Sequence, residues 1–393
     1  MTSICAISFK ECWQDGSGAW LSTGGFPLQM GAIASLFDRM TLLVTRREEP
    51  GEGGIPLPVK AEIVVLRRPR GKGFRRKVSV LAHLFEYLSV IARHVRQSDA
   101  VHVPPPGDIP LLGMIVALAL RKRLLVRYCG SWSSTSQTTT MNRVTRGLMS
   151  LFAGGRNVML ATGIAATPPA RRMNWIFATA STQNEVARVR PDLDRPARRP
   201  LRIVYAGRLS RIKGVLVLLE ALRRLGRTNP ESLARLELVV AGDGEERNLL
   251  EKAIRADGLR DRVRVAGQLD RHLLMRTLCE ADVCVLPSLS ESFCKARVDA
   301  MLCGTPVLTT EVGFGRELVG ADSERGWLVT SGDPDALASA LASLVDEPRD
   351  WPALRRRCRT FAESLTLENW VAEIGRVCAS QWGAKLTDGK LAF

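Results

Sequence analysis

The chain has 393 residues, 46% hydrophobic and 24% charged, which is the composition of a globular protein with apolar material for two domains. Its formal net charge of +16 predicts attraction to polyanions. The nine cysteines are scattered without a C-x-x-C pair, which argues against a disulfide framework and favours buried thiols in a reducing compartment.

Two features bear on targeting. The amino terminus lacks a basic region followed by a long apolar run, so we expect no signal peptide. The longest apolar stretch, residues 109–120, is too short to span a bilayer. The sequence therefore predicts a cytoplasmic protein that is able to rest on the inner face of a membrane.

The first half of the chain alternates short apolar runs with helical patterns. Gly24 and Gly25 follow the first predicted strand and let the backbone approach a ligand closely, although a plain tight turn explains them equally well. His102 ends a strand, where cleft residues lie, but a packed histidine is the commoner case. Strands are predicted at 3–9, 41–45, 63–66, 100–103, 124–128, 158–161 and 175–180, and helices at 28–37, 78–96, 109–120 and 181–188.

The densest basic segment runs from Arg67 to Lys77 and reads RRPRGKGFRRK. A solvated loop is the simplest explanation, but the local excess favours anionic lipid headgroups, which attract each cation by about 1 kcal/mol. Phe74 would insert into the membrane interface. No zinc-finger spacing or RNP-like aromatic motif is present, so we expect no nucleic-acid partner.

The second half begins after residues 191–200, a Pro- and Arg-rich segment that predicts an interdomain linker. A strand at 201–205 is followed by Arg208 and Lys213 and then by a helix at 215–225. Two cations beside the free N–H groups of a helix can hold a pyrophosphate, whereas the alternative is ordinary surface charge.

Residues 286–307, LPSLSESFCKARVDAMLCGTPV, predict a strand, loop, helix and second strand. The loop lies at the carboxyl end of a parallel strand, where open α/β sheets bind their ligands. Glu291 precedes the helix and Asp299 lies about two turns into it. A helix amino terminus between two acids suits a ligand that carries both phosphate and hydroxyl groups.

This stretch resembles the signature of the retaining family-4 glycosyltransferases of the GT-B fold. The resemblance rests on Glu291, Phe293 and the run from Ala300 through Gly304 to Pro306-Val307, with the family's spacing kept. Ser292 and Cys294 replace the usual glycines, and Asp299 replaces the usual second glutamate.

The resemblance implies an α/β protein of the GT-B fold, with two Rossmann-like domains facing each other across a cleft. Residues 1–190 would form the acceptor-binding domain, 191–200 the linker and 201–364 the nucleotide-sugar-binding domain, and 365–393 would cross back to the first domain. It also implies a nucleoside-diphosphate sugar as donor, with no metal and no further cofactor.

The resemblance also implies catalytic roles. Arg208 and Lys213 would neutralise the leaving nucleoside diphosphate, and Glu291 would accept hydrogen bonds from the sugar hydroxyls. Asp299, one methylene shorter than the family's glutamate, would face the ribose. Many relatives carry a histidine where this chain has Cys129. The expected donor-binding residues are Gly24, Gly25, Gly207, Gly267, Phe293, Cys294, Lys295 and Asp299.

The function expected from these features is a retaining, metal-independent transfer of a hexose-type sugar to a saccharide or lipid-linked acceptor. The altered Ser292, Cys294, Asp299 and Cys129 motivate a second hypothesis, a catalytically weak scaffold or binding subunit. A third is a sugar-nucleotide epimerase or hydrolase, for which a chain with four histidines is poorly supplied.

Overall fold

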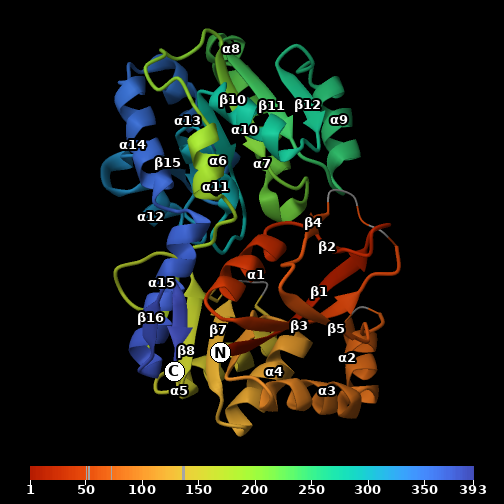
Figure 1. Cartoon of the computed structure of the whole chain (residues 1–393). Helices are drawn as coiled ribbons and strands as arrows, with labels where there is room; N and C mark the ends of the chain where they lie inside the picture. Colours follow the sequence, from red (N-terminus) through yellow and green to blue (C-terminus); the bar gives the residue numbers. More distant parts are fainter. Residues whose placement is uncertain (50, 52–53, 72, 135–137) are drawn as a thin grey trace. The chain divides into compact units, whose positions relative to one another are not determined.

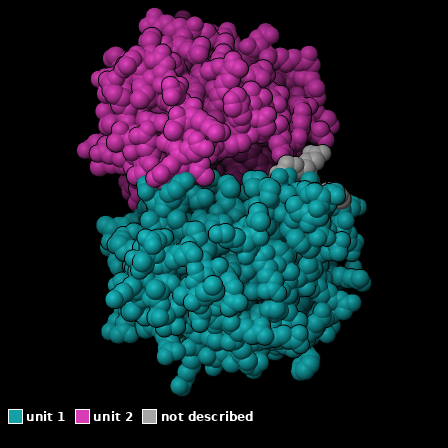
Figure 2. All heavy atoms as spheres, in the orientation of Figure 1, with its two compact units in different colours: residues 1–180, 367–393 teal, residues 181–366 magenta. Residues whose placement is uncertain are grey.

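The computed structural model describes residues 1–49, 51, 54–71, 73–134 and 138–393. The chain forms two compact units (Figure 2), of which unit 1 comprises Met1–Ala180 with Leu367–Phe393 and unit 2 comprises Ser181–Thr366. Residues 181–190, which the prediction gave to the first domain, therefore belong to unit 2. Their helix packs there because Arg359 donates a hydrogen bond to the Val186 carbonyl.

Unit 1 is built on a mainly parallel sheet whose parallel strands follow the order β5-β3-β1-β6-β7-β8-β9. Two short antiparallel strands, β2 and β4, extend it next to the carboxyl end of β1. The strands are β1 (Ser3–Gln14), β2 (Trp20–Ser22), β3 (Arg39–Arg46), β4 (Ile55–Pro56), β5 (Ala61–Leu66), β6 (Ala100–Val103), β7 (Arg123–Tyr128), β8 (Asn157–Thr162) and β9 (Asn174–Ile176).

Both faces of this sheet are covered, as is usual for parallel sheets. Ile4 and Ala6 of β1 join a core with α1 and α15, whereas Cys5 and Ile7 join a second core with α3 and α4. The remaining elements of unit 1 are α1 (Phe26–Ser35), α2 (Gly73–Ala82), α3 (Leu84–Arg96), α4 (Asp108–Ala119), α5 (Thr140–Phe152), α15 (Leu367–Trp382) and the hairpin β16 (Lys385–Thr387) with β17 (Lys390–Ala392) (Figure 1).

Two predicted elements of unit 1 differ from the structure. The loop expected after the first strand is largely a hairpin, because β1 continues to Gln14 and pairs Trp13 with Leu21. The single helix expected at 78–96 is two helices, which begin earlier and bend by 60° at His83. Among the described residues no single helix is long and apolar enough to cross a membrane, and only this bent pair passes the length and composition test together.

Unit 2 contains a parallel sheet in the order β12-β11-β10-β13-β14-β15. Its core joins Ile203 and Tyr205 of β10 to Leu218 and Leu222 of α7. The strands are β10 (Leu201–Ala206), β11 (Leu236–Ala241), β12 (Val263–Gly267), β13 (Val283–Leu286), β14 (Val307–Thr310) and β15 (Gly326–Val329). The helices are α6 (Gln183–Arg188), α7 (Val215–Thr228), α8 (Pro230–Ala234), α9 (Arg247–Ala256), α10 (Arg271–Cys279), α11 (Lys295–Leu302), α12 (Gly315–Val319), α13 (Pro334–Asp346) and α14 (Trp351–Glu363).

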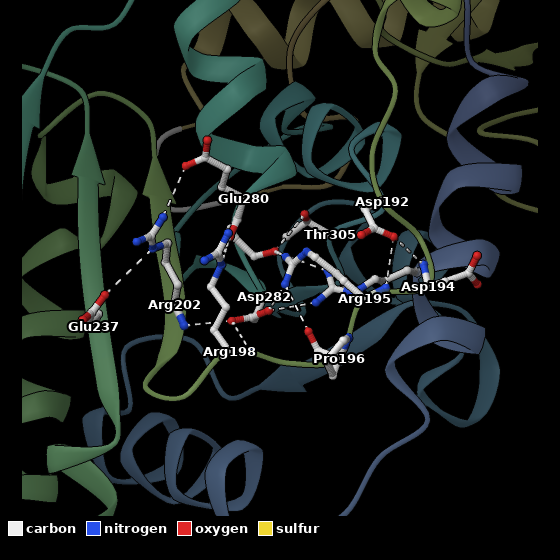
Figure 3. A network of polar contacts seen from close by, with 12 residues as sticks. Asp192, Asp194, Arg195, Pro196, Arg198, Arg202, Glu237, Glu280, Asp282 and Thr305 are labelled. Atoms are coloured by element: carbon white, nitrogen blue, oxygen red, sulfur yellow. Dashed lines mark hydrogen bonds and ion pairs between the residues drawn. The ribbon is translucent and has the colours of Figure 1, made fainter.

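The predicted linker, residues 191–200, is fixed to unit 2 by a buried carboxylate (Figure 3). Asp282, which directly precedes β13, is fully buried and accepts from the guanidinium groups of Arg195 and Arg355. The backbone N–H groups of Arg198 and Arg202 also donate to it, over 3.2 and 2.9 Å. Four donors therefore satisfy one buried acid and hold the linker against the amino end of the sheet.

Candidate active site

The candidate site lies at the carboxyl ends of β10 and β13. These strands are neighbours in the sheet, with Ile203 paired to Val283, although about eighty residues separate them along the chain. In chain order the strands lie 3-2-1-4-5-6, so the order reverses between β10 and β13. Open α/β sheets bind ligands at this reversal, because the loops that leave the two strands diverge there.

The structure brings two of the predicted catalytic residues into direct contact. Lys213, after β10, forms an ion pair with Oε1 of Glu291, after β13. The Lys213 side chain is 30% exposed and that of Glu291 is 10% exposed, so the pair is open to solvent on the lysine side. The backbone supports it, since the N–H of Leu289 donates to the Ile212 carbonyl over 2.8 Å.

Gly214 explains why the two loops approach so closely. Its φ of +71° is in the left-handed region, and a Cβ at this position would lie 2.0 Å from the carbonyl oxygen of Pro287. Only glycine therefore allows the β10 loop to lie against the β13 loop. The Lys-Gly pair at 213–214 places the ammonium group and the tight contact on consecutive residues.

Arg208 begins the same loop that Lys213 ends. Its side chain is exposed, and within the described part of the chain it forms no ion pair. Its carbonyl accepts a hydrogen bond from the buried Tyr205 hydroxyl over 2.9 Å, which fixes the loop backbone. Burial raises the pKa of Tyr205, and the neighbouring Cys294, Glu246 and Glu291 add to the shift, so this tyrosine stays neutral beneath the site.

The α11 amino terminus follows Glu291. Phe293 is buried and packs on Phe314, with ring centroids 6.4 Å apart. Cys294 is the helix N-cap and has a φ of +55°, a conformation that favours the family's glycine. Burial, followed by the Glu291 charge, raises the pKa of the Cys294 thiol to about 11, so it is not a thiolate nucleophile at neutral pH. Helix α11 begins at Lys295, whose N–H group belongs to the first turn, where intrahelical acceptors are lacking.

Asp299 has a partner that the sequence did not indicate. Both of its carboxylate oxygens contact the Arg271 guanidinium, at 2.7 and 2.9 Å. Arg271 also donates to Glu185 over 2.6 Å and to the Ser181 hydroxyl over 2.9 Å. Although burial opposes it, the pair with Asp299 raises the pKa of Arg271. A ribose contact by Asp299 therefore has to share this carboxylate with a guanidinium.

Arg297 is a second residue that sequence reasoning did not identify. It is 0% exposed, and its guanidinium donates to the Thr309 hydroxyl over 2.9 Å and to the carbonyls of Val312 and Thr310 over 3.2 and 3.3 Å. No carboxylate among the described residues forms an ion pair with it. An unpaired buried cation is costly, so Arg297 adds positive charge behind the α11 amino terminus.

The loop that Arg297 holds also contacts the Glu291 loop. A Cβ on Gly313, whose φ is +63°, would lie 2.5 Å from the Ser292 carbonyl oxygen. Arg297 and Gly313 together therefore fix the loop after β14 against the segment that carries Glu291. The only sequence signal for Arg297 is a charged residue on the buried side of an apolar helix.

The predicted glycines lie in both units. Gly207 donates its N–H to the Ala241 carbonyl over 3.0 Å, and Gly267 accepts from the Gly242 N–H over 2.7 Å, so these turns join successive loops of the unit 2 sheet. Gly24 and Gly25 lie in unit 1, directly before α1, where the Gln29 N–H donates to the Gly25 carbonyl. Every other residue expected to be catalytic or to bind the donor belongs to unit 2.

His102 and Cys129 complete the list of candidates in unit 1. His102 is fully buried, its Nδ1 lies 3.0 Å from the Leu125 carbonyl oxygen, and burial lowers its pKa to about 3. It is therefore a neutral core residue rather than a cleft residue. Cys129, at the position of the family's histidine, is an exposed thiol that follows β7.

Comparison with known proteins shows what unit 2 resembles. The family described as glycosyl transferases group 1 matches residues 192–364, which lie entirely within unit 2. Unit 2 therefore resembles the group 1 glycosyltransferases over residues 192–364. A glycogen synthase of Mycobacterium tuberculosis is 34% identical over 172 residues, which are 44% of this chain and 40% of that protein. The D-inositol 3-phosphate glycosyltransferase 2 of Catenulispora acidiphila is 35% identical over 151 residues, or 37% and 35% of the two chains. The chain thus matches about two fifths or less of the length of these relatives.

Solved structures extend the likeness to both units. The Anabaena protein Alr3699/HepE, solved with UDP and glucose, covers 97% of this chain and is itself covered completely, with a TM-score of 0.66 and 19% identity. Sucrose-phosphate synthase from Thermosynechococcus elongatus covers 98%, again with complete coverage, with a TM-score of 0.69 and 20% identity. These matches confirm the predicted GT-B fold.

Proposed function

We propose that the protein is a retaining, metal-independent glycosyltransferase that moves a hexose-type sugar from a nucleoside-diphosphate sugar to a saccharide or lipid-linked acceptor. The observation that carries the proposal is the Lys213–Glu291 ion pair at the point where the strand order reverses in a unit that resembles the group 1 glycosyltransferases. A cation for phosphate and a carboxylate for hydroxyls are the two groups that such a donor requires.

The chemistry follows from these groups. When the bond between the anomeric carbon and the diphosphate oxygen breaks, its electron pair stays on the diphosphate, and Arg208 and Lys213 stabilise that charge. The sugar develops oxocarbenium character while Glu291 accepts hydrogen bonds from its hydroxyls. The acceptor hydroxyl then bonds to the anomeric carbon and passes its proton to the departing diphosphate oxygen. Because two side-chain cations neutralise the leaving group, the proposal includes no metal and no other cofactor.

The ion pair also prepares the site before the donor binds. Lys213 is held by Glu291, so its ammonium is already positioned when a diphosphate arrives. The α11 amino terminus at Lys295 and the buried Arg297 add positive potential on the same side of the sheet. Donor binding then transfers Lys213 wholly or partly from a carboxylate to a phosphate.

The acceptor is proposed to carry an anionic group. Unit 1 contains a cavity of about 290 Å³ at the carboxyl ends of β1 and β3. Lys10, Arg47, Arg68 and Arg76 line it together with the single acid Glu11, which Arg68 neutralises over 2.8 Å. An excess of cations in a concave site suits a phosphate-bearing saccharide or lipid-linked acceptor. A cytoplasmic enzyme at the inner face of a membrane fits such an acceptor.

Turnover of a panel of nucleotide sugars tests the proposal. Lys213→Ala is expected to lower kcat at least about a hundredfold, because a transition-state charge loses its cation. Lys252→Ala, which removes an exposed lysine from α9, is the matched control and should leave turnover unchanged. Equal activity of Lys213→Ala and the control would contradict the proposal.

One pair of observations favours a second candidate, a catalytically weak binding subunit. Asp299 is occupied by Arg271, and Cys294 has a backbone conformation suited to glycine. A protein that is stabilised by a nucleoside diphosphate but turns over none of the tested donors would support this alternative. Failure of UDP, GDP and ADP to raise the melting temperature would instead show that the donor pocket is no longer used.

A further inference from the structure

Helix α2 presents an apolar stripe to solvent. Val78, Leu81 and Phe85 are 49, 67 and 86% exposed, and Ala82 between them is also exposed. Val78, Leu81 and Ala82 follow the i, i+3, i+4 spacing that places side chains on one face of a helix, and Phe85 follows in the first turn of α3, beyond the bend at His83. In soluble helices this spacing marks the face that packs inward, so an exposed apolar face of this kind indicates a binding surface.

The opposite side of α2 is the one that packs on unit 1. Val80 lies against the core that contains Tyr87 and Ile91, and the Ser79 hydroxyl accepts from the Arg70 N–H over 2.9 Å. Beyond the bend, the outward residues of α3 become polar and include Glu86, Ser89, Arg93 and Arg96. The apolar stripe is therefore confined to α2 and the first turn of α3.

Cations surround this stripe. Residues 67–86 contain seven Lys and Arg and a single acid, Glu86, which pairs with Arg67 over 3.7 Å. Arg68 and Arg76 also have carboxylate partners, Glu11 and Asp108. The exposed Arg70, Arg75 and Lys77 form no ion pair within the described residues. Lys72 and the Phe74 side chain lie outside the described part of the structure, so the predicted insertion of Phe74 stays untested.

We propose that α2 is an interfacial helix that seats unit 1 on an anionic lipid bilayer, with Val78, Leu81 and Phe85 inserted among the acyl chains and Arg70, Arg75 and Lys77 on the headgroups. A helix with basic residues beside large exposed apolar side chains binds in the plane of such an interface. Charge complementarity selects an anionic bilayer over a neutral one. The bend at His83 lets α2 lie against the membrane while α3 packs in unit 1.

This inference extends the sequence-based expectation of a basic segment on lipid headgroups with Phe74 inserted, because it adds the exposed apolar residues Val78, Leu81 and Phe85. It sharpens the proposed membrane partner, and it places the acceptor cavity near the bilayer, since Arg68 and Arg76 line that cavity and belong to the same basic segment. It does not depend on donor chemistry, so the two proposals can fail separately.

Flotation of the full chain with vesicles tests the inference. Vesicles of phosphatidylcholine with about a third phosphatidylglycerol should bind the protein, and phosphatidylcholine alone should bind it at least about tenfold less. Leu81→Ser/Phe85→Ser should lower binding to the anionic vesicles at least about tenfold. The control Leu151→Ser, which changes a leucine of α5 that is 74% exposed, should have no effect.

A second pair of variants separates charge from insertion. Arg75→Glu/Lys77→Glu should weaken binding in a salt-dependent manner. Lys252→Glu/Arg255→Glu on α9 changes the net charge equally and should not. Binding to anionic vesicles that survives Leu81→Ser/Phe85→Ser, or equal losses in variant and control, would overturn the proposal. A dimer in solution that Leu81→Ser/Phe85→Ser dissociates would assign the face to a second copy of the chain and would also overturn it.

Nucleotide binding at the donor site gives a readout that is independent of membrane binding. A nucleoside diphosphate should raise the melting temperature of wild type and Leu81→Ser/Phe85→Ser equally, because the substituted residues lie in unit 1 and the donor residues in unit 2. Loss of that shift in both proteins would count against the proposed function while leaving the membrane result intact. A shift lost only in Leu81→Ser/Phe85→Ser would show misfolding, and the single variant Phe85→Ser would then decide by its vesicle binding.

Discussion

The two ends of β13 carry one acid each, and their surroundings are opposite. At the amino end, Asp282 is fully buried and accepts from two guanidinium groups and two backbone N–H groups. At the carboxyl end, Glu291 has one ammonium partner, which is 30% exposed, and a Ser288 hydroxyl at 3.5 Å. A fully satisfied buried acid stabilises a fold, whereas a partly satisfied acid beside an open cation is available for a ligand.

We call the amino end of β13, where Asp282 is fully buried, the closed end. Removing the charge of Asp282 should have the largest effect on stability. Asp282→Asn leaves Arg195 and Arg355 without their buried counter-charge, which costs about 3–5 kcal/mol. Urea unfolding followed by tryptophan fluorescence should show a much lower midpoint. Asp335→Asn, which removes an exposed acid paired with Arg224, is the control and should leave the midpoint unchanged. Similar midpoints for the two variants would remove the contrast between the two ends of β13.

We call the carboxyl end of β13, where the Lys213 partner of Glu291 is exposed to solvent, the open end. Removing the charge of Glu291 should instead affect turnover. Glu291→Gln is expected to lower kcat by about a hundredfold or more, because a carboxylate that binds sugar hydroxyls in the transition state becomes a weaker acceptor. Its unfolding midpoint should change little, since the pair with Lys213 is partly solvated. A large loss of stability with normal turnover would reverse the roles assigned to the two acids.

The sequence predicted the open end better than the closed end, for a physical reason. The segments around Gly207–Gly214 and Glu291–Pro306 carry their signals locally, through glycines, cations and helix limits that act within a few residues. Asp282, Arg271 and Arg297 act through partners that only the fold brings near. Arg271 reaches Asp299 across 28 residues, and Asp282 joins residues from 195 to 355.

Unit 1 shows the same limit. Its parallel strands are evident as apolar runs, but the bend at His83 and the outward apolar stripe of α2 were not evident, because periodicity alone does not show which face of a helix is buried. The fold class therefore followed from the sequence, while the contacts that tune the site required the structure.

Substitution of the buried Arg297, which lies near the open end of β13, should have a smaller effect than substitution of Glu291. Arg297→Met should weaken nucleoside-diphosphate affinity about tenfold, because the site loses a positive charge held in a region of low dielectric. Arg297→Lys should recover part of that loss, since it keeps the charge. The KM for the donor should rise more than kcat falls. Unchanged donor affinity in Arg297→Met would show that this cation only holds the loop after β14.

The smallest expected effect concerns backbone strain at the open end. Cys294→Gly relieves a positive φ and should raise the unfolding free energy by about 0.5–1 kcal/mol, with turnover kept because the protonated thiol takes no chemical part. Thermal unfolding measures the gain. Cys129→Gly, at an exposed cysteine without positive φ, should show none. Loss of turnover in Cys294→Gly would reveal a role for the thiol.

The most direct test is calorimetric titration of the intact chain with UDP, GDP and ADP, for wild type, Lys213→Ala and the control Lys252→Ala. We expect at least one nucleotide to bind wild type and the control equally, and to bind Lys213→Ala at least about tenfold more weakly. Binding that is the same in all three proteins would contradict a diphosphate pocket built on Lys213 and Glu291.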